Sequence, residues 1–384
     1  MPDKKKFNFE TIAIHGETRE DSKEGGEPVI YPRVDSTTFR MSEKEDVTPV
    51  YTRHENPNRS QLESILAVME QGEAAAAFSS GMAASTAILQ ALEPGAHVLI
   101  PNDLYHGVRK LAVEIMASWN LEVTSADMTR IGEIEKALQP NTKMVWAETP
   151  SNPLLEITDI EKTAELCNRR NLLLVVDNTW PSPVNMQPLS LGADLVMHST
   201  SKYIGGHSDL LGGAVIAKTG KGIFEKIRDL QQSTGSVPSP GDCWMMLRSI
   251  RTLPWRMRGH NENAGIVAEY LANHKFVSKV FYPGLPDHPG HGTAKKQMNG
   301  FGGMLSFLVK GNREETGRVF LSSELIYPAT SLGGVESLWE HRIRSEGPGS
   351  TTPDNLIRLS VGLEHPEDII ADIDQALKAV FSSH

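Results

Sequence analysis

Lys202 is the residue whose surroundings most favour chemistry by a side-chain amine. It stands in residues 197–209 (MHSTSKYIGGHSD), after three hydroxyl residues and before two glycines. A lysine amine becomes a nucleophile when its pKa is lowered, and it can then hold a carbonyl compound as a Schiff base. The neighbouring hydroxyls, which include Ser199 and Ser201, can hold a phosphate. Taken alone, the stretch is more typical of a solvated surface loop, so the rest of the sequence has to decide.

A carboxylate follows the apolar run at residues 172–176. Asp177 comes directly after this run, and a carboxylate at the end of a buried strand must be paired or hydrogen-bonded. It could bind a metal, cap the next turn or neutralise a cationic ring nitrogen. Adjacent strands of one sheet would bring Asp177 and Lys202 to the same edge.

Two further residues fit a binding site for a phosphorylated aromatic ring. Gly81 opens a predicted helix, and a helix N-terminus with a glycine lets an anion approach closely. Tyr105 follows another predicted strand and could stack on a planar ring. An ordinary helix start and core packing are the alternatives. With Asp177 and Lys202, these residues supply the groups that pyridoxal 5′-phosphate uses in proteins.

Short apolar runs alternate with helical segments between residues 97 and 217. This alternation predicts an α/β fold with a doubly wound, mostly parallel sheet, in which ligands bind at the carboxyl ends of the strands. The predicted strands are residues 97–100, 121–124, 144–147, 172–176, 195–197 and 214–217. The predicted helices between them include residues 111–117, 131–138 and 160–169.

The N-terminal residues predict an extended arm followed by a helix. Residues 1–58 are rich in Gly, Pro and charge, and such an arm lies on its own domain or on a partner subunit. The helix is predicted to begin at Ser60, which would form a capping box with Glu63, and to end at Gly72.

The C-terminal third predicts a smaller α+β domain. A Ser/Gly/Pro-rich stretch at residues 231–242 predicts the boundary before it. The predicted elements are a long helix at 243–273, strands at 304–309 and 356–361, and a final helix at 366–380. The expected units are therefore an arm, a large domain and a C-terminal domain, at residues 1–58, 59–242 and 243–384.

Composition limits the classes of partner. The net charge of −10 argues against a nucleic-acid partner and a basic membrane-binding surface. No apolar run approaches the ~20 residues that a membrane helix needs, and residues 1–10 do not resemble a signal peptide. Two cysteines are too few for a disulfide framework, which fits a cytoplasmic protein. We expect no metal, because no further ligand completes the pair His288 and His291.

Seven stretches make the chain resemble the Cys/Met-metabolism family of pyridoxal-phosphate enzymes, which carry out trans-sulfuration. The resemblance covers residues 11–377. It rests on YTRHENPNR (51–59), SSGMAA (79–84), ETPSNPLL (148–155), VVDNTW (175–180), HSTSKYIGGHSD (198–209), SLGGVESL (331–338) and LIRLSVGLE (356–364). The resemblance implies the type I fold of pyridoxal-phosphate transferases.

The resemblance also implies a role for each matching residue. Lys202, Asp177 and Tyr105 would be catalytic: the lysine carries the cofactor and moves protons, the carboxylate pairs with the pyridine nitrogen and the tyrosine stacks on the ring. Ser331 and Arg358 would bind the substrate, the arginine through its carboxylate. The remaining cofactor-binding residues would be Tyr51, Arg53, Gly81, Met82, Asn152, Ser199 and Ser201.

Tyr51 and Arg53 would reach the cofactor phosphate of a neighbouring subunit. The resemblance therefore implies a homo-oligomer, a tetramer built from dimers that share active sites. The implied reaction is γ-replacement or γ-elimination on homoserine esters or cystathionine, as in cystathionine γ-synthases and γ-lyases. Cystathionine β-lyase, methionine γ-lyase and O-acetylhomoserine sulfhydrylase activities are the alternatives, and a non-catalytic oligomeric scaffold is the alternative outside enzymes.

Some residues depart from the pattern of the family. Thr330 stands where many cystathionine enzymes carry glutamate, which weakens recognition of the distal amino group of cystathionine. After Tyr105 the sequence is HGVR, where relatives often have GGT, and the missing cysteine counts against a methionine γ-lyase. Ser331 followed by Leu332 favours γ over β chemistry.

Overall fold

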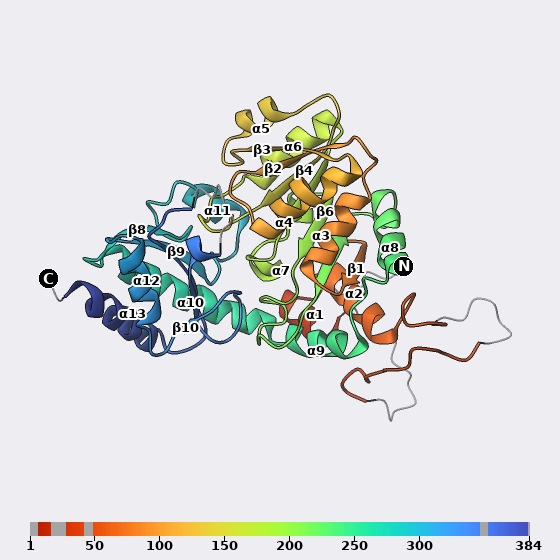
Figure 1. The fold of residues 1–384 in the computed structure, drawn as a ribbon. Helices are drawn as coiled ribbons and strands as arrows, with labels where there is room; N and C mark the ends of the chain where they lie inside the picture. The colour runs from red at the N-terminus through yellow and green to blue at the C-terminus, as the bar shows by residue number, and fades with distance from the viewer. Residues whose placement is uncertain (1–6, 17–27, 42–48, 346–351, 383–384) are drawn as a thin grey trace.

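Two β-sheets organise the chain, and helices lie against both of them (Figure 1). The computed structural model describes residues 7–16, 28–41, 49–345 and 352–382. The larger sheet has the strand order β1-β7-β6-β5-β4-β2-β3, and the smaller has the order β10-β11-β12-β9-β8. The strands of the larger sheet are β1 (Ala74–Phe78), β2 (His97–Pro101), β3 (Glu122–Ala126), β4 (Thr142–Glu148), β5 (Leu173–Asp177), β6 (Leu195–His198) and β7 (Gly213–Ala217).

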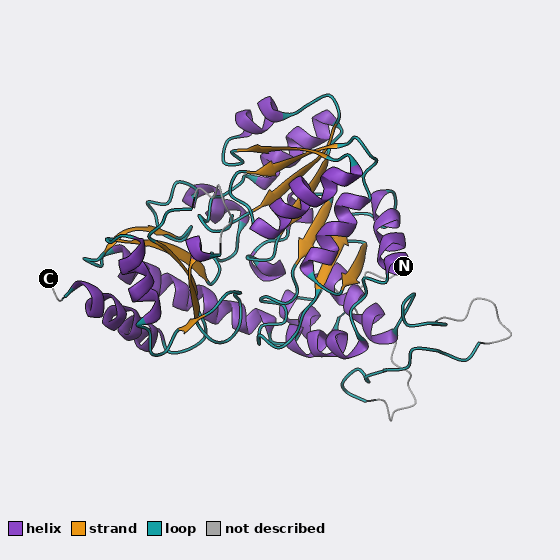
Figure 2. Ribbon diagram, viewed as in Figure 1, coloured by secondary structure: helices purple, strands orange, loops and turns teal. Residues whose placement is uncertain are grey.

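The larger sheet is mostly parallel, as predicted. Only β7 runs against its two neighbours, β6 and β1. Strands such as β2, β6 and β7 are buried throughout, because helices cover both faces of the sheet (Figure 2). The predicted strands all occur. Strand β1 was not predicted, since its run of four alanines carries a weak strand signal.

The helices around this sheet correct two predictions. Helix α2 begins at Pro57, after an Asn56 cap, so the predicted start at Ser60 and its capping box with Glu63 are wrong. Proline is favoured at this first helical position because its missing N–H would have no partner there. The predicted helix at 111–117 is part of a longer irregular segment made of α4 (His106–Lys110), a π-helical turn (Leu111–Ile115) and a 3₁₀ turn (Met116–Trp119).

The other helices on this side of the molecule bury apolar faces against the sheet or one another. They are α1 (Phe9–His15), α3 (Gly81–Gln90), α5 (Ile131–Ala137), α6 (Ile160–Arg170), α7 (Ser182–Asn185), the 3₁₀ turn Pro188–Leu191, α8 (Ile223–Thr234) and α9 (Pro240–Ile250).

The predicted long helix at 243–273 is two helices. Helix α9 is followed by α10 (Leu253–Ala272), with a break at Arg251 and Thr252. Pro254 explains the break, because a proline has no N–H for the preceding turn of a helix. Helix α9 packs against α2, while α10 continues to the smaller sheet.

The smaller sheet forms the C-terminal α+β domain that the sequence predicted. Its strands are β8 (Val277–Phe281), β9 (Met304–Val309), β10 (Tyr327–Pro328), β11 (Leu338–His341) and β12 (Leu356–Ser360). Its helices are α11 (His291–Gln297), α12 (Arg313–Leu321), the 3₁₀ turn Arg342–Arg344 and α13 (Pro366–Phe381). A separate apolar core unites α10, α13 and this sheet.

The described part of the N-terminal arm lies beside the larger-sheet domain and extends away from it (Figure 1). Its two described segments, residues 28–41 and 49–56, are joined by an antiparallel bridge between Thr38 and Tyr51. Asn58 connects the first of these segments to α2, since its side chain accepts from the N–H of Val34 and donates to the carbonyl of Pro32, at 2.8 Å each. Among the helices described here, none is long and apolar enough to cross a membrane.

Candidate active site

A cavity of about 350 Å³ lies between the carboxyl ends of the parallel strands and the smaller sheet. Strands β4, β5 and β6 lead into it from one side, and β11 and β12 contribute residues from the other. The cavity brings together most of the residues predicted from the sequence: Gly81, Met82, Tyr105, Asn152, Asp177, Ser199, Ser201, Lys202, Ser331 and Arg358.

Lys202 enters the cavity from the turn that follows β6. The N–H of Lys202 donates to the carbonyl of Ser199. The carbonyl of Lys202 accepts from the N–H of Gly206, whose φ of 71° is one that glycine adopts easily. The ammonium donates to Ser331 Oγ at 2.6 Å. Burial and the nearby Arg358 lower the pKa of Lys202 to about 8. The neutral, nucleophilic amine is therefore a much larger fraction near neutral pH than for an ordinary lysine.

Asp177 ends β5 directly opposite Glu148, the last residue of β4. Both side chains are buried. Burial raises the pKa of Asp177, although hydrogen bonds from Thr179 and the nearby His198 oppose the rise. Burial and the charge of Asp177 raise the pKa of Glu148 much further. Of the two carboxyls, Asp177 is therefore the one better placed to carry a negative charge, because Thr179 donates hydrogen bonds to it.

Thr179 was not predicted as a site residue, yet it joins two that were. Its N–H donates to Asp177 Oδ1 at 3.0 Å, and its hydroxyl accepts from the N–H of Ser199 at 2.9 Å. This contact fixes the end of β5 against the turn after β6. Its position in the VVDNTW stretch, two residues after Asp177, was the available signal.

Gly81 and Ser199 form a cradle for a small anion. A Cβ atom at Gly81 would lie 2.8 Å from the Cβ of Ser199, so only glycine allows this close approach. Gly81 is also the first residue of α3, where the N–H groups of the first turn have no partners within the helix. Ser80 caps that helix by accepting from Ala83. The hydroxyls and free N–H groups at this end of the cavity suit a phosphate.

The predicted phosphate ligand Ser201 lines the cavity, but its hydroxyl is used within the loop. It donates to the carbonyl of Gly212 at 3.2 Å and accepts from the N–H of Gly212 at 2.9 Å. Ser201 therefore shapes the loop that carries Lys202, and a direct contact with phosphate stays a prediction.

Behind the cradle, His198 and Glu70 form a buried pair. His198 Nε2 lies 2.6 Å from Glu70 Oε1, and both side chains are almost fully buried. Asn178 donates to the same carboxylate oxygen at 2.8 Å. Glu70 directly follows α2, so these contacts tie the end of that helix to the ends of β5 and β6.

Tyr105 is held over the cavity by its backbone and by a glycine. Its N–H donates to Glu148 Oε2 at 3.1 Å, which links the tyrosine to the carboxyl pair. A Cβ atom at Gly107 would lie 2.6 Å from the tyrosine ring, so the HGVR sequence leaves room for this ring orientation. The ring makes an edge contact with His106 at 4.9 Å between centroids.

Arg358 lies at the opposite end of the cavity, as part of a buried charged group. Its guanidinium donates to Asn152 Oδ1 at 3.0 Å and approaches Glu340 at 2.8 Å. Arg342 approaches the same oxygen of Glu340 at 3.0 Å. A carboxylate held between two arginines keeps a lowered pKa, despite its burial. The sequence did not predict Glu340 or Arg342, because no motif marks their position on the smaller sheet.

Tyr51 and Arg53 lie apart from this group. Neither is among the described residues that line the cavity, and Tyr51 is 44% exposed. Arg53 donates to the carbonyl of Gln232 at 2.8 Å, with its guanidinium 5.8 Å from the tyrosine ring. Their predicted contact with a neighbouring subunit stays a prediction. In the described ranges, no group of three or more His, Cys, Asp or Glu side chains could hold a metal ion.

Comparison with known proteins agrees with this geometry. The model of the family described as Cys/Met metabolism PLP-dependent enzyme matches residues 10–378. The chain belongs to this family. It is therefore an enzyme that uses pyridoxal 5′-phosphate, and the amine, carboxyl and anion cradle of the cavity fit that cofactor. The alternative of a non-catalytic scaffold is set aside.

The relatives carry several names within the family. The chain is 44% identical to a cystathionine gamma-synthase of Mycobacterium bovis over 375 residues, which cover 96% of each chain. It is 42% identical to a cystathionine gamma-lyase of Bacillus subtilis, covering 96% of this chain and 99% of the relative. The crystal structure of metB from Corynebacterium glutamicum superposes with a TM-score of 0.93 at 41% identity, covering 97% and 98% of the two chains.

Proposed function

We propose that this enzyme carries out γ-replacement or γ-elimination on homoserine esters or cystathionine. The observation that supports the proposal is the shared cavity of Lys202, Asp177 and Arg358, in which the lysine has a pKa of about 8. The names of the relatives support trans-sulfuration but divide between synthase and lyase. Pyridoxal 5′-phosphate supplies an electron-accepting ring that stabilises negative charge at the substrate α-carbon.

Each side chain of the cavity would have a role that follows from its position. Arg358 would bind the substrate carboxylate in a bidentate manner, and its contacts with Asn152 and Glu340 hold it in one orientation. Lys202 Nζ would take the proton from the α-carbon and return it at a neighbouring carbon. Ser331 Oγ, 2.6 Å away, would keep this amine in place between transfers. Asp177 would keep the ring nitrogen protonated.

The phosphate end of the cavity supports a contribution from a second copy. Lys202, Arg342 and Arg358 are the lysine and arginine side chains among the described residues that line the cavity. The two arginines are held by Glu340, and Lys202 is the anchor of the cofactor. Within the described ranges, a phosphate at Gly81 and Ser199 therefore has no dedicated lysine or arginine from its own chain. We propose that Arg53 and Tyr51 of a neighbouring copy complete the site.

This proposal gives the arm, residues 1–58, its role. The smallest unit with complete sites would be a dimer, and we propose a tetramer of two such dimers in the cytoplasm. The two cysteines are free and buried, which is compatible with a reducing compartment. Size measurement by light scattering tests the oligomeric state.

Product analysis tests the reaction. The purified enzyme is incubated with cystathionine, with an O-acylhomoserine plus cysteine, and with methionine. Formation of cystathionine from the ester, or of 2-oxobutanoate from cystathionine, supports γ chemistry. Pyruvate from cystathionine would instead assign a β-lyase, and activity on methionine alone would assign a methionine γ-lyase. The Lys202→Ala variant is expected to lose all of these reactions, and full activity would contradict the proposal.

A further inference from the structure

Arg59 is a buried arginine outside the cavity whose hydrogen bonds go to the base of the arm. It lies in the first turn of α2, and its side chain is 2% exposed. Its Nη1 donates to the carbonyl of Thr52 at 2.8 Å, and its Nη2 donates to the carbonyl of Arg53 at 3.3 Å. One guanidinium thus holds two consecutive peptide groups, directly beside Tyr51.

A guanidinium in this position constrains the backbone more than a single hydrogen bond would. The planar fork of arginine fixes the directions of both carbonyls at once. The two carbonyls belong to the peptide planes on either side of the Arg53 Cα, so fixing both planes sets the direction in which the Arg53 side chain leaves the chain. Burying a charge is costly, so the two carbonyls and the nearby Glu63 must offset that cost.

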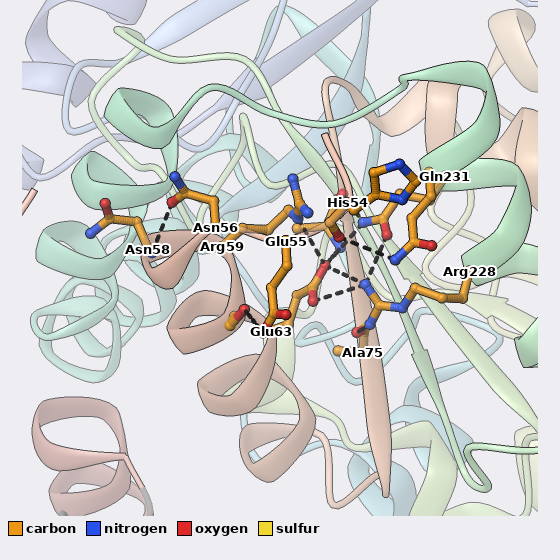
Figure 3. Close-up of polar contacts among 12 residues, drawn as sticks. His54, Glu55, Asn56, Asn58, Arg59, Glu63, Ala75, Arg228 and Gln231 are labelled. Carbon is orange, nitrogen blue, oxygen red and sulfur yellow. Dashed lines mark hydrogen bonds and ion pairs between the residues drawn. The ribbon is translucent and has the colours of Figure 1, made fainter. Parts of the chain in front are cut away.

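Glu63 provides a rigid support for Arg59 (Figure 3). Its Oε1 lies 3.9 Å from Arg59 Nε and accepts from the N–H of Ala77, at 2.8 Å. The same oxygen accepts from Gln231 at 2.9 Å and from Arg228 at 2.8 Å. Helix α2, strand β1 and helix α8 therefore meet at one carboxylate.

A second pair of hydrogen bonds holds the arm from the other side. Arg53 donates to the carbonyl of Gln232, and the side chain of Gln232 donates to the carbonyl of His54 at 3.1 Å. The backbone of residues 52–54 is thus held by α2 and by the end of α8. The Tyr51 side chain stays exposed and is not among the described residues that line the cavity of its own chain.

We propose that Arg59 is a positioning residue that holds Arg53, in the turn directly after Tyr51, in the orientation needed at the active site of a neighbouring copy. This inference rests on the proposed sharing of sites. Arg59 is not among the described residues that line the cavity of its own chain, so its effect on cofactor affinity would be exerted on the partner subunit.

Mixed oligomers can separate an effect on the partner from an effect within one chain. Arg59→Met is co-expressed with Lys202→Ala under two affinity tags, and oligomers carrying both are purified. In these oligomers, Lys202 is present only in the Arg59→Met subunit. The arm that reaches its active site comes from the Lys202→Ala subunit, in which Arg59 is unchanged. The readout is the cofactor concentration that half-saturates borohydride trapping on Lys202, determined by mass spectrometry.

The Arg59→Met homo-oligomer is expected to need about ten-fold more cofactor, as for the loss of one charged hydrogen bond. The mixed oligomer should return to within about two-fold of the wild type, because its working site has an intact arm. Arg59→Lys keeps the charge but not the planar guanidinium. It should show a smaller loss of cofactor affinity, and the mixed oligomer should restore that affinity as well. These variants test the inference even if Arg59→Met folds poorly.

Two reference variants make failure informative. Arg53→Ala paired with Lys202→Ala tests the sharing of sites itself. If cofactor affinity recovers in this mixed oligomer but not in the one that carries Arg59→Met, the positioning role is overturned while the shared site stands. If neither recovers, the shared site fails, and the inference fails with it. Arg228→Met disturbs the same cluster through Glu63 and Ala75, and its loss of stability should not be relieved by the partner.

Discussion

Glu148 and Asp177 lie side by side at the ends of two parallel strands, in register across β4 and β5. Two buried carboxyl groups on neighbouring positions of adjacent strands cannot both be ionised without a large cost in free energy. Their environments differ: Thr179 and His198 favour the charge on Asp177, and the charge of Asp177 raises the pKa of Glu148. Glu148 is therefore the carboxyl of the pair whose environment favours the protonated form more strongly.

This asymmetry predicts different outcomes for isosteric substitutions. Glu148→Gln replaces a protonated carboxyl by an amide of similar shape, so cofactor affinity should stay within about three-fold of the wild type. Asp177→Asn removes the charge that stabilises a protonated ring nitrogen, and kcat should fall by about 10²-fold or more. Cofactor titration and steady-state kinetics measure both. Equal losses in the two variants would show that the charge is not localised on Asp177.

The pKa of Lys202 predicts the pH dependence of cofactor attachment. Its pKa is lowered to about 8, so the neutral amine increases as pH rises and reaches half at about pH 8, far below the range of an ordinary lysine. Glu340 opposes this lowering, and Glu340→Gln should therefore move the midpoint to still lower pH. The measurement is the initial rate of borohydride-trapped attachment to the apoenzyme across pH 6–10. A midpoint near pH 10 would contradict the burial of the amine.

Gly81→Ala is predicted to weaken cofactor binding by closing the anion cradle. The added Cβ would lie 2.8 Å from the Cβ and 3.0 Å from the Oγ of Ser199, so one of the two elements must move. We expect at least about a ten-fold rise in the cofactor dissociation constant, as for an overpacked contact that costs 1–3 kcal/mol. Gly132→Ala in α5 is the matched control, since its Cβ would meet nothing within 4 Å. An unchanged dissociation constant for Gly81→Ala would exclude the cradle.

Glu63→Ala is predicted to destabilise the fold more than loss of a surface ion pair. It leaves Arg228, Gln231 and the N–H of Ala77 without their shared acceptor. Removing one partner of a buried charged network costs about 3–5 kcal/mol. Glu133→Ala breaks only the exposed pair with Lys136 and should change the unfolding midpoint little. Urea unfolding of the two variants makes the comparison, and equal midpoints would contradict a stabilising role for the cluster.

The larger sheet could be predicted because its strands are buried on both faces. Their apolar runs between turn residues are visible without knowledge of the partners. Strand β1 was not predicted, because its alanines pack well between α3 and β7 but have a low intrinsic preference for strands. The start of α2 was misplaced because Ser60 and Glu63 have the spacing of a capping box, whereas Glu63 is buried and serves Arg228.

The site was predictable where it depends on parallel strands. Asp177 and Lys202 follow neighbouring strands, and the carboxyl ends of such strands meet at one edge. Glu148 obeys the same rule and could have been identified as the residue after the run at 144–147. Glu340 and Arg342 could not, because they reach the cavity from a second, mostly antiparallel sheet whose placement against the first depends on tertiary packing.

Helix α2 (Pro57–Met69) makes buried polar contacts near both of its ends. Arg59 holds the arm near the first end, and Glu70, just beyond the second, meets His198 beside the phosphate cradle. An α-helix advances by about 1.5 Å and turns by about 100° per residue. A single residue inserted between Glu63 and Glu70 would therefore rotate one contact away whenever the other was kept. The number of residues in α2 is consequently constrained by these two contacts, because a change in that number breaks one of them.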